Sequence, residues 1–171
     1  VRLMNEKAAQ LGATATNFAN PCGYHNDNHY TTPADMAKIA RYAMTNKKFR
    51  EIVSTKTYQL EPTNKHDSWP LLATTNKLMQ FDDGKDFTIN GVKTGYTGPA
   101  GYTLVTSAVN SEGLELISVV MGLKEYGSQS RIRTFSKELL AYGFNNFERV
   151  TLLKANSVYK KVQVIDAKDD E

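Results

Sequence analysis

The chain has 171 residues, of which 40% are hydrophobic and 23% charged, and its formal net charge is +3. This composition suffices for a folded core and excludes wholesale disorder. Lysine and arginine form no block longer than two residues, so we expect no nucleic-acid partner. A single cysteine, Cys22, excludes an internal disulfide framework, and no apolar run approaches the ~18 residues that a membrane span needs.

The first part of the chain predicts two helices separated by a long loop. Apolar residues recur in a helical pattern over residues 1–12, which a glycine closes. Residues 13–30 are polar and rich in turn formers, which predicts a loop. Threonine, proline and an acid within residues 31–35 are typical of a helix start, so we expect a second helix from there to about residue 46.

Strand signals follow these helices. Residues 49–53 predict a further helical turn, residues 55–60 a strand and residues 62–70 a loop. Residues 71–81 fit a strand and a short helix equally well, and the Asp-Asp-Gly turn at 82–84 ends them.

The chain is organised around the segment that begins at Phe87. Its first strand-forming run leads to Lys93, after which Thr94-Gly95 places a hydroxyl and a bare backbone at a strand edge. Residues 102–109 and 114–123 predict an antiparallel hairpin, and their apolar residues at odd and even positions predict cover on both faces.

Two further elements are expected after this hairpin. Residues 127–145 have a helical apolar side, and residues 148–165 alternate as a strand does. We find no internal repeat and no low-complexity tract.

Three groups of residues outside this segment could carry chemistry, and each has a plainer interpretation. His25 and His29 have the spacing of a metal pair on a helix, but they lie in the predicted loop and lack the glutamate of the zinc-protease motif. Cys22 near His25 could be a thiol nucleophile, although one cysteine near one histidine is common. Three aspartates within residues 82–86 do not fit the EF-hand spacing and indicate a solvated turn. We therefore expect no metal site.

A more specific signal comes from stretches that follow one another in a defined order. They are the opening helical stretch at 1–12, FANPCGYHNDNHYTTPADMAKIARYAM at 18–44, TTNKL at 74–78, GVKTGYTGPAGYTLVTSA at 91–108, LISVVMG at 116–122 and LLAYGF at 139–144. Together they resemble the penicillin-binding-protein-type D-alanyl-D-alanine carboxypeptidases, which are serine DD-peptidases of low molecular mass. The resemblance covers nearly the whole chain up to about Phe147. Several separate matches in the right order make chance a poor explanation, whereas K-T-G alone would not.

The resemblance implies an α/β fold with a mainly antiparallel sheet flanked by helices. Residues 1–147 would form the C-terminal portion of a DD-peptidase catalytic domain, and residues 148–171 would begin a β-rich stalk domain. Because both ends look cut from a longer polypeptide, we expect this chain to be a fragment that requires an N-terminal part to fold and act.

The family works through three motifs, S-x-x-K on a helix, S-x-N on a loop and K-T-G on a strand. We expect the first two to precede residue 1, so that the nucleophile, its lysine and the middle motif come from that missing part. The literal S-x-x-K at Ser157–Lys160 follows K-T-G in a strand-like stretch, and Tyr24-His25-Asn26 lies too late to be the middle motif. Thr74-Thr75-Asn76 belongs to the T-N-K-L stretch.

The resemblance assigns roles to the residues around K-T-G. Lys93 would supply a fixed positive charge beside the serine, and Thr94 would donate its hydroxyl to the terminal carboxylate of the substrate. Gly95 would let the substrate backbone lie along the strand edge. The backbone N–H of Tyr96 would form half of the oxyanion hole, and Thr97 would also contact the substrate.

An arginine after the last strand often contacts the substrate carboxylate in this family. Arg131 and Arg133 both compete for this role, and the spacing does not decide between them. The tyrosine at Tyr96 replaces the histidine of some relatives, which leaves substrate preference open.

The implied partners are peptidoglycan stem peptides ending in D-Ala-D-Ala and β-lactam antibiotics, without a cofactor. The implied location is extracytoplasmic, at the outer face of the cytoplasmic membrane, where such enzymes are held by a C-terminal amphipathic helix. Two alternatives stay open: a related β-lactamase or DD-endopeptidase, and a non-catalytic cell-wall-binding module.

Overall fold

The computed structural model describes residues 1–80, 84–125 and 127–160. Five helices and five strands lie in these ranges. The helices are α1 (Arg2–Gln10), α2 (Pro33–Ala43), α3 (Lys47–Ser54), α4 (Lys77–Gln80) and α5 (Ser128–Asn146). The strands are β1 (Thr57–Tyr58), β2 (Leu72–Ala73), β3 (Thr88–Thr97), β4 (Gly101–Val109) and β5 (Glu115–Leu123).

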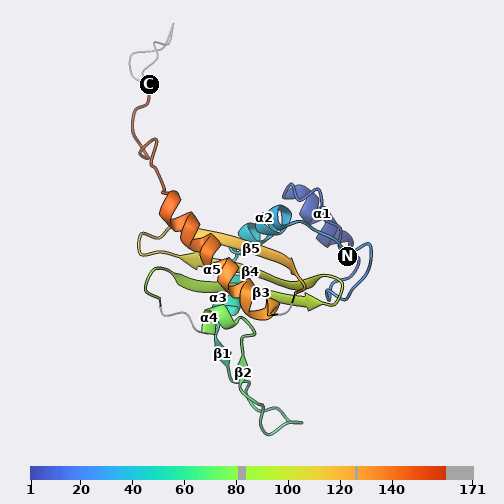
Figure 1. The fold of residues 1–171 in the computed structure, drawn as a ribbon. Coiled ribbons are helices and arrows are strands. Elements are labelled where there is room, and N and C mark those ends of the chain that lie inside the picture. The colour runs from blue at the N-terminus through green and yellow to red at the C-terminus, as the bar shows by residue number, and fades with distance from the viewer. Residues whose placement is uncertain (81–83, 126, 161–171) are drawn as a thin grey trace, which may run out of the picture.

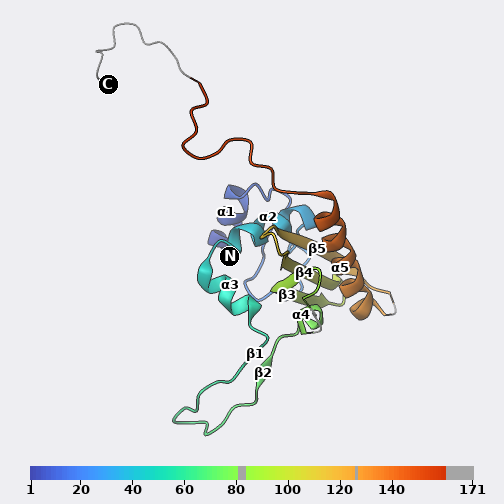
Figure 2. The ribbon, with the colours of Figure 1, turned by 90° about the vertical axis from the view of Figure 1, so that its left-hand side faces the viewer.

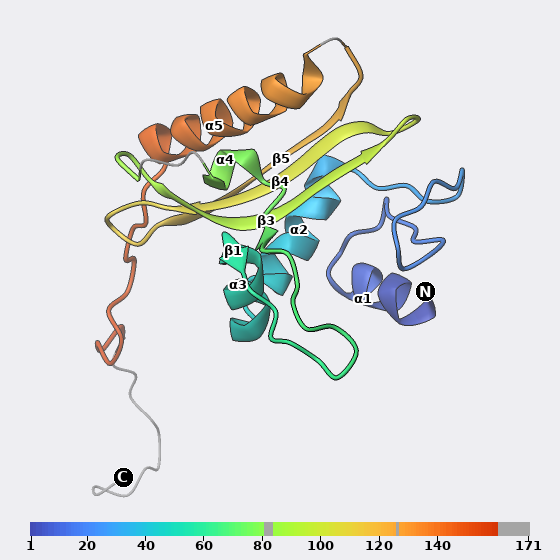
Figure 3. The same cartoon turned by 90° about the horizontal axis from the view of Figure 1, so that it is seen from below.

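Three layers make up the body of the molecule. Strands β3, β4 and β5 form an antiparallel sheet in that order. Helix α5 lies along one face of this sheet, while α2 and α3 lie on the opposite face (Figures 1 and 3). The predicted α/β fold with a mainly antiparallel sheet flanked by helices is confirmed.

Tight turns hold the register of this sheet. Asn110 stabilises the turn between β4 and β5, because its Oδ1 accepts hydrogen bonds from the backbone N–H groups of Glu112 at 3.1 Å and Leu114 at 2.9 Å. Gly113 in this turn has φ +76°, a conformation that glycine adopts without a steric penalty. The predicted hairpin and its cover on both faces are confirmed.

The main core lies between the sheet and the helices α4 and α5. Ala108 of β4 packs there against residues of the neighbouring elements, and Gly143 allows α5 to approach the sheet closely. A Cβ at Gly143 would lie 2.6 Å from Cδ1 of Leu116, so no larger residue fits there without displacing that side chain. The buried core residues are Met79, Phe87, Ile89, Ala108 and Leu140.

The predicted helix signals are confirmed at α1 and α2. Helix α1 ends at Gln10, and Gly12 just beyond it has φ +73°. Thr32 caps α2 by accepting a hydrogen bond from the backbone N–H of Asp35 at 3.2 Å, and Pro33 is the first helical residue.

The middle of the chain differs from the prediction in its details. The turn predicted at 49–53 is part of the longer helix α3, and the strand predicted at 55–60 is reduced to the two residues of β1. Residues 71–81 contain both predicted alternatives in succession, β2 and then α4. β1 and β2 pair at the base of an arm that projects from the body of the molecule (Figure 2).

The strand predicted at 148–165 is wrong over its described part. Residues 148–160 form no strand, and the apolar side chains of Val150, Leu152, Val158 and Tyr159 are exposed. Alternating apolar residues form a strand only where a neighbouring strand supplies hydrogen bonds. Residues 161–165 lie outside the described residues, and the domain boundary at 147/148 stays a prediction.

One polar cluster ties α3 to the sheet. The guanidinium of Arg50 donates hydrogen bonds to both carboxylate oxygens of Glu115, at 2.5 and 2.8 Å, and to the carbonyl oxygen of Met44. Asn90 and Ser107 donate to the same carboxylate at 3.0 and 2.9 Å. The Arg50 guanidinium lowers the pKa of Glu115 most; partial burial opposes it, and the Asn90 and Ser107 hydrogen bonds add to the lowering.

None of the helices in the described ranges is both long and apolar enough to cross a membrane.

The Arg50–Glu115 pair predicts a dependence of stability on pH. Because the pKa of Glu115 is lower in the folded state than in the unfolded chain, the pair stabilises the fold above about pH 4.5 and loses its effect as the pH falls further. Glu115→Gln should therefore lower the free energy of unfolding at pH 7 by about 1 kcal/mol, a modest value since solvent screens the partly exposed Arg50.

Urea denaturation at pH 7 and pH 4 measures this effect, and the difference between the two pH values should shrink in the variant. Glu112→Gln is the matched control, because Glu112 is an exposed glutamate in the turn before β5. An equal effect of the two substitutions would show that the Arg50 pair contributes nothing specific.

Candidate functional site

The K-T-G residues lie within β3, which is an edge strand of the three-stranded sheet. The strand does not end at Lys93 as predicted but continues through Thr97, because Thr94 pairs with Leu104 and Gly95 with Thr103 of β4. The other edge of β3 carries no sheet partner among the described strands. The backbone of K-T-G therefore pairs with β4 along one edge, and its other edge has no sheet partner among the described strands.

A hollow of about 330 Å³ runs along this part of β3, and we call it the K-T-G hollow. Its size is at the lower end of the range for small-ligand sites. Residues of β3, β4, α5 and the segment before α4 line it. The lining residues that matter below are Thr75, Lys93, Thr94, Gly95, Tyr96 and Arg133.

The two polar side chains of K-T-G are held in different ways. The hydroxyl oxygens of Thr94 and Thr75 lie 2.7 Å apart, so the threonine before α4 orients the threonine of K-T-G. The ammonium of Lys93 is exposed and donates a hydrogen bond to the carbonyl oxygen of Thr94. Both groups lie where a bound ligand can reach them.

The structure distinguishes the two arginines that the sequence left open. Arg133 is half-buried, lines the K-T-G hollow and donates a hydrogen bond to the carbonyl oxygen of Gln129 at 3.0 Å. Arg131 is exposed and forms an ion pair with Glu125, and its guanidinium lies 5.3 Å from the ring centre of Phe135. Of the two arginines, only Arg133 lies in the hollow with Lys93.

A second hollow of about 170 Å³ lies beside the end of β3, and we call it the loop hollow. Residues 23–26 and His29 of the loop between α1 and α2 form one wall, and β3 with β4 forms the other. Gly95 and Tyr96 line both hollows. Thr97 lines only the loop hollow, where its hydroxyl accepts a hydrogen bond from the N–H of Ala100 at 3.3 Å.

The glycine of K-T-G also lies close to its neighbour on β4. A Cβ at Gly95 would lie 2.5 Å from the hydroxyl oxygen of Thr103, which is closer than real Cβ atoms approach other atoms. Tyr96 and Tyr102, the next pair along the two strands, pack with ring centres 4.5 Å apart.

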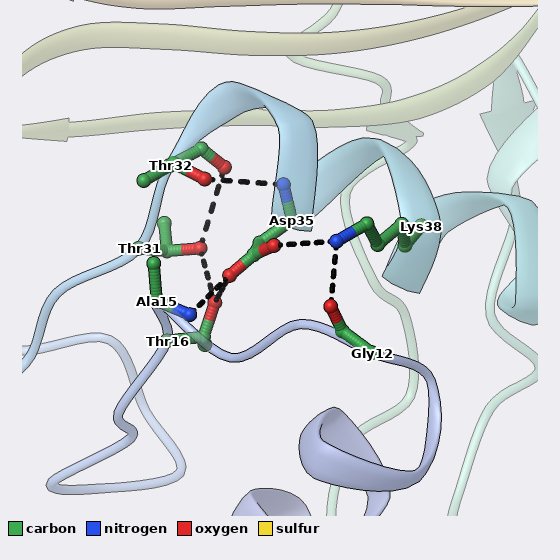
Figure 4. A network of polar contacts seen from close by, with 7 residues as sticks. All are labelled: Gly12, Ala15, Thr16, Thr31, Thr32, Asp35 and Lys38. Carbon is green, nitrogen blue, oxygen red and sulfur yellow. Dashed lines mark hydrogen bonds and ion pairs between the residues drawn. The ribbon is translucent and has the colours of Figure 1, made fainter.

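The loop that forms the second hollow is fixed to α2 through Asp35 (Figure 4). The buried carboxylate of Asp35 accepts hydrogen bonds from the N–H of Ala15 at 2.7 Å and the hydroxyl of Thr16 at 3.0 Å, and it pairs with Lys38 at 3.0 Å. Lys38 also donates to the carbonyl oxygen of Gly12. Burial opposes the charged form, but these donors together hold the pKa of Asp35 below its ordinary value.

The other candidate groups have structural partners of their own. His25 pairs with Asp27 at 3.3 Å, while the ring of His29 packs edge-on against Phe18. Cys22 is exposed and lies 3.3 Å from the side-chain oxygen of Asn20. Among the residues that the structure describes, no three His, Cys, Asp or Glu side chains form a group that could hold a metal ion.

Two other candidates from the sequence remain, the literal S-x-x-K motif and the aspartates near Gly84. Ser157–Lys160 lies in the irregular, exposed segment after α5, so its serine and lysine do not face each other on a helix. Asp82 and Asp83 lie outside the described residues.

Sequence reasoning missed Thr75 and Thr103 as site residues. Thr75 lies in the T-N-K-L stretch. This stretch was part of the family resemblance, but none of its residues was assigned a role in the site. Thr103 could have been found from the strand register, because it is the cross-strand partner of Gly95.

Known proteins resemble this chain in sequence and fold. The D-alanyl-D-alanine carboxypeptidase family matches residues 1–125. The chain is 34% identical to D-alanyl-D-alanine carboxypeptidase DacF of Bacillus subtilis (strain 168) over 164 residues, and this match covers 96% of the chain and 40% of that protein. It is also 34% identical to D-alanyl-D-alanine carboxypeptidase DacA of Haemophilus influenzae over 170 residues, which covers 96% of the chain and 39% of that protein.

Solved structures agree with the sequence matches. The Streptomyces K15 DD-transpeptidase superposes with a TM-score of 0.73 at 32% identity, over 83% of this chain and 52% of that one. Penicillin binding protein 5 from Haemophilus influenzae gives a TM-score of 0.70 at 36% identity, over 86% of this chain and 39% of that one. The chain thus spans about 40% of the length of the two curated relatives. With this family match over most of its length, the chain belongs to the D-alanyl-D-alanine carboxypeptidase family.

Proposed function

We propose that the protein to which this chain belongs is a serine-type D-Ala-D-Ala carboxypeptidase. It removes the terminal D-alanine from peptidoglycan stem peptides through an acyl-enzyme, and penicillins acylate the same serine. The observation that carries this proposal is the K-T-G hollow, in which Lys93, Thr94 and Arg133 meet beside the open edge of β3.

The hollow suits a peptide that ends in a carboxylate. Two cations, Lys93 and Arg133, line it, and the Thr94 hydroxyl is oriented between them and Thr75. A guanidinium binds a carboxylate through two parallel hydrogen bonds, which fixes the direction of the peptide. The terminal carboxylate therefore binds Thr94 and Arg133, and Arg131, paired with Glu125, takes no part.

The open edge of β3 positions the scissile bond. A substrate backbone aligned with Gly95 forms main-chain hydrogen bonds as an added strand. The backbone N–H of Tyr96 supplies half of the oxyanion hole, and Thr97 contacts the substrate further along the strand. Lys93 stabilises the negative charge that develops in the transition state, an effect that is strongest where water is excluded.

The nucleophile comes from outside these 171 residues. We propose that an S-x-x-K helix and an S-x-N loop from another part of the polypeptide face the K-T-G hollow. The relatives, which are about two and a half times as long as the matched region, support this part of the proposal. Residues 1–147 then belong to the catalytic domain, and residues 148–171 lead into a second, β-rich domain.

The reaction also implies a location and a role. Because peptidoglycan lies outside the cytoplasmic membrane, the protein acts there, held at the membrane by a C-terminal helix, in peptidoglycan biosynthesis and the control of cell shape.

Transpeptidation is the second candidate function. It is favoured by the structural likeness to an enzyme named as a DD-transpeptidase, which differs in passing the acyl group to an amine instead of water. Hydrolysis of a D-Ala-D-Ala peptide in the presence and absence of an added amino acceptor separates the two.

Labelling of the full-length protein with a fluorescent penicillin tests the proposed function. The wild-type protein should become labelled and should release D-alanine from a D-Ala-D-Ala peptide. Lys93→Ala should reduce both activities by about 100-fold or more, as expected when a charge that stabilises the transition state is lost. Lys137→Ala, on the exposed side of α5, is the control. A wild-type protein that is neither labelled nor active would contradict the proposal.

The two arginines provide a matched pair. Arg133→Gln should lower kcat/KM for D-alanine release by about 10- to 100-fold, because a hydrogen-bonded charge partner of the carboxylate is removed. Arg131→Gln should change it less than about twofold, since Arg131 pairs with Glu125 away from the hollow. Steady-state kinetics on both variants decides the assignment, and a larger loss in Arg131→Gln would reverse it.

A double substitution tests why K-T-G needs its glycine. Gly95→Ala should lower the free energy of unfolding by about 1–3 kcal/mol and slow penicillin acylation, because the added methyl group overlaps the Thr103 hydroxyl. The double variant Gly95→Ala/Thr103→Ala should recover stability and most of the acylation rate. Recovery of stability alone would instead mean that the substrate itself requires the bare backbone at Gly95.

A further inference from the structure

The loop hollow is placed to contact the same ligand as the K-T-G hollow. Gly95 and Tyr96 line both, so a peptide that lies along β3 with its carboxylate at Arg133 continues from one hollow into the other. The volume of about 170 Å³ has room for one amino-acid side chain. The part of the substrate that reaches it is on the acyl side, away from the leaving D-alanine.

The chemistry of the lining points to a neutral, hydrogen-bonding group. Hydroxyl, amide and imidazole side chains line the loop hollow, and no Lys, Arg, Asp or Glu is among them. Asn26 uses its side-chain oxygen to accept a hydrogen bond from the N–H of Asn28 at 2.9 Å, which turns its amide N–H groups to other partners. Thr103 adds a hydroxyl beside Gly95.

The charges around the rim disfavour an anion. His25 could offer a positive charge, but it pairs with the exposed carboxylate of Asp27 at 3.3 Å. A carboxylate of the substrate placed there would gain no unpaired cation and would lie near the carboxylate of Asp27. A carboxamide would instead donate and accept hydrogen bonds without this cost.

The loop is pre-organised for this contact. The side-chain oxygen of Asn20 accepts hydrogen bonds from the N–H groups of Gly23 at 2.8 Å and Tyr24 at 3.1 Å, and its nitrogen donates to the carbonyl oxygen of Tyr24 at 2.8 Å. Asp35 anchors the start of the loop to α2 (Figure 4). A wall fixed in this way costs little entropy when a ligand binds.

From these observations we propose that the loop hollow is a specificity subsite for the residue that precedes D-Ala-D-Ala. It selects a neutral carboxamide-bearing side chain over the corresponding carboxylate, through hydrogen bonds from Asn26 and Thr103. This inference rests on the proposed function and adds to it the chemical class of the acyl-side residue.

The test uses the full-length protein and two peptides ending in D-Ala-D-Ala. The peptides differ only in the preceding residue, which carries a carboxamide in one and a carboxylate in the other. The wild-type protein should prefer the carboxamide peptide by about tenfold in kcat/KM, the factor that one net hydrogen bond contributes.

A matched pair of loop variants localises the preference. Asn26→Asp keeps the oxygen that binds the N–H of Asn28 but places a negative charge in the hollow, so the preference should rise by about another tenfold. Asn28→Asp adds the same charge to the same loop outside the lining and should leave the preference within about twofold.

The outcomes separate the subsite from the proposed function. Equal kcat/KM values for the two peptides, or an equal change in both variants, would overturn the subsite while D-alanine release and penicillin labelling persist. Loss of D-alanine release from both peptides together with absence of labelling in the wild-type protein would overturn the proposed function and the subsite with it.

Discussion

The pairing of β3 with β4 is the interaction on which the candidate site depends. The register that joins Gly95 to Thr103 puts Thr94 and Leu104 on one face of the sheet, and it puts Gly95 and Thr103, which line both hollows, on the other. Because side chains alternate across a sheet, a slip by one residue would exchange these faces and separate Thr94 from Thr75. The K-T-G side chains can therefore come together in the K-T-G hollow only in this register.

The fold and much of the site could be predicted from local sequence signals. The cap at Thr32, the hairpin and the strand character around Lys93 each depend on a few neighbouring residues, and these predictions are confirmed. The strand predicted after Glu148 failed because its alternation says nothing about whether a partner strand is available. The loop hollow was not predicted, because its two walls are about 70 residues apart in the sequence and meet only through tertiary packing.

The choice between Arg131 and Arg133 shows most clearly where sequence reasoning stops. Residues two positions apart on an α-helix project about 200° apart around its axis. Arg131 and Arg133 are such a pair, and they flank the buried Ile132. Which flank faces β3 depends on how α5 crosses the sheet. The buried residues of α5 run along the helix from Ser128 to Gly143, and Gly143 allows a close approach to Leu116 of β5. Contacts along the whole helix, and not the spacing of the two arginines, therefore decide which of them faces β3.

An open strand edge serves binding and is also a hazard, because any other strand can pair with it. In β3 the same residues affect both ligand binding and unwanted pairing with other strands. Lys93 places an exposed charge on the edge, which opposes pairing with another chain. Under the proposed function, the same charge would favour a peptide that carries a carboxylate. The loop at residues 23–26 and the Arg133 side chain line the two hollows that meet at Gly95, and both restrict access to the strand edge there. Under the proposed function, such an edge would admit a short anionic peptide more readily than a long strand. Protection from aggregation and selection of the proposed substrate would then follow from one arrangement of side chains.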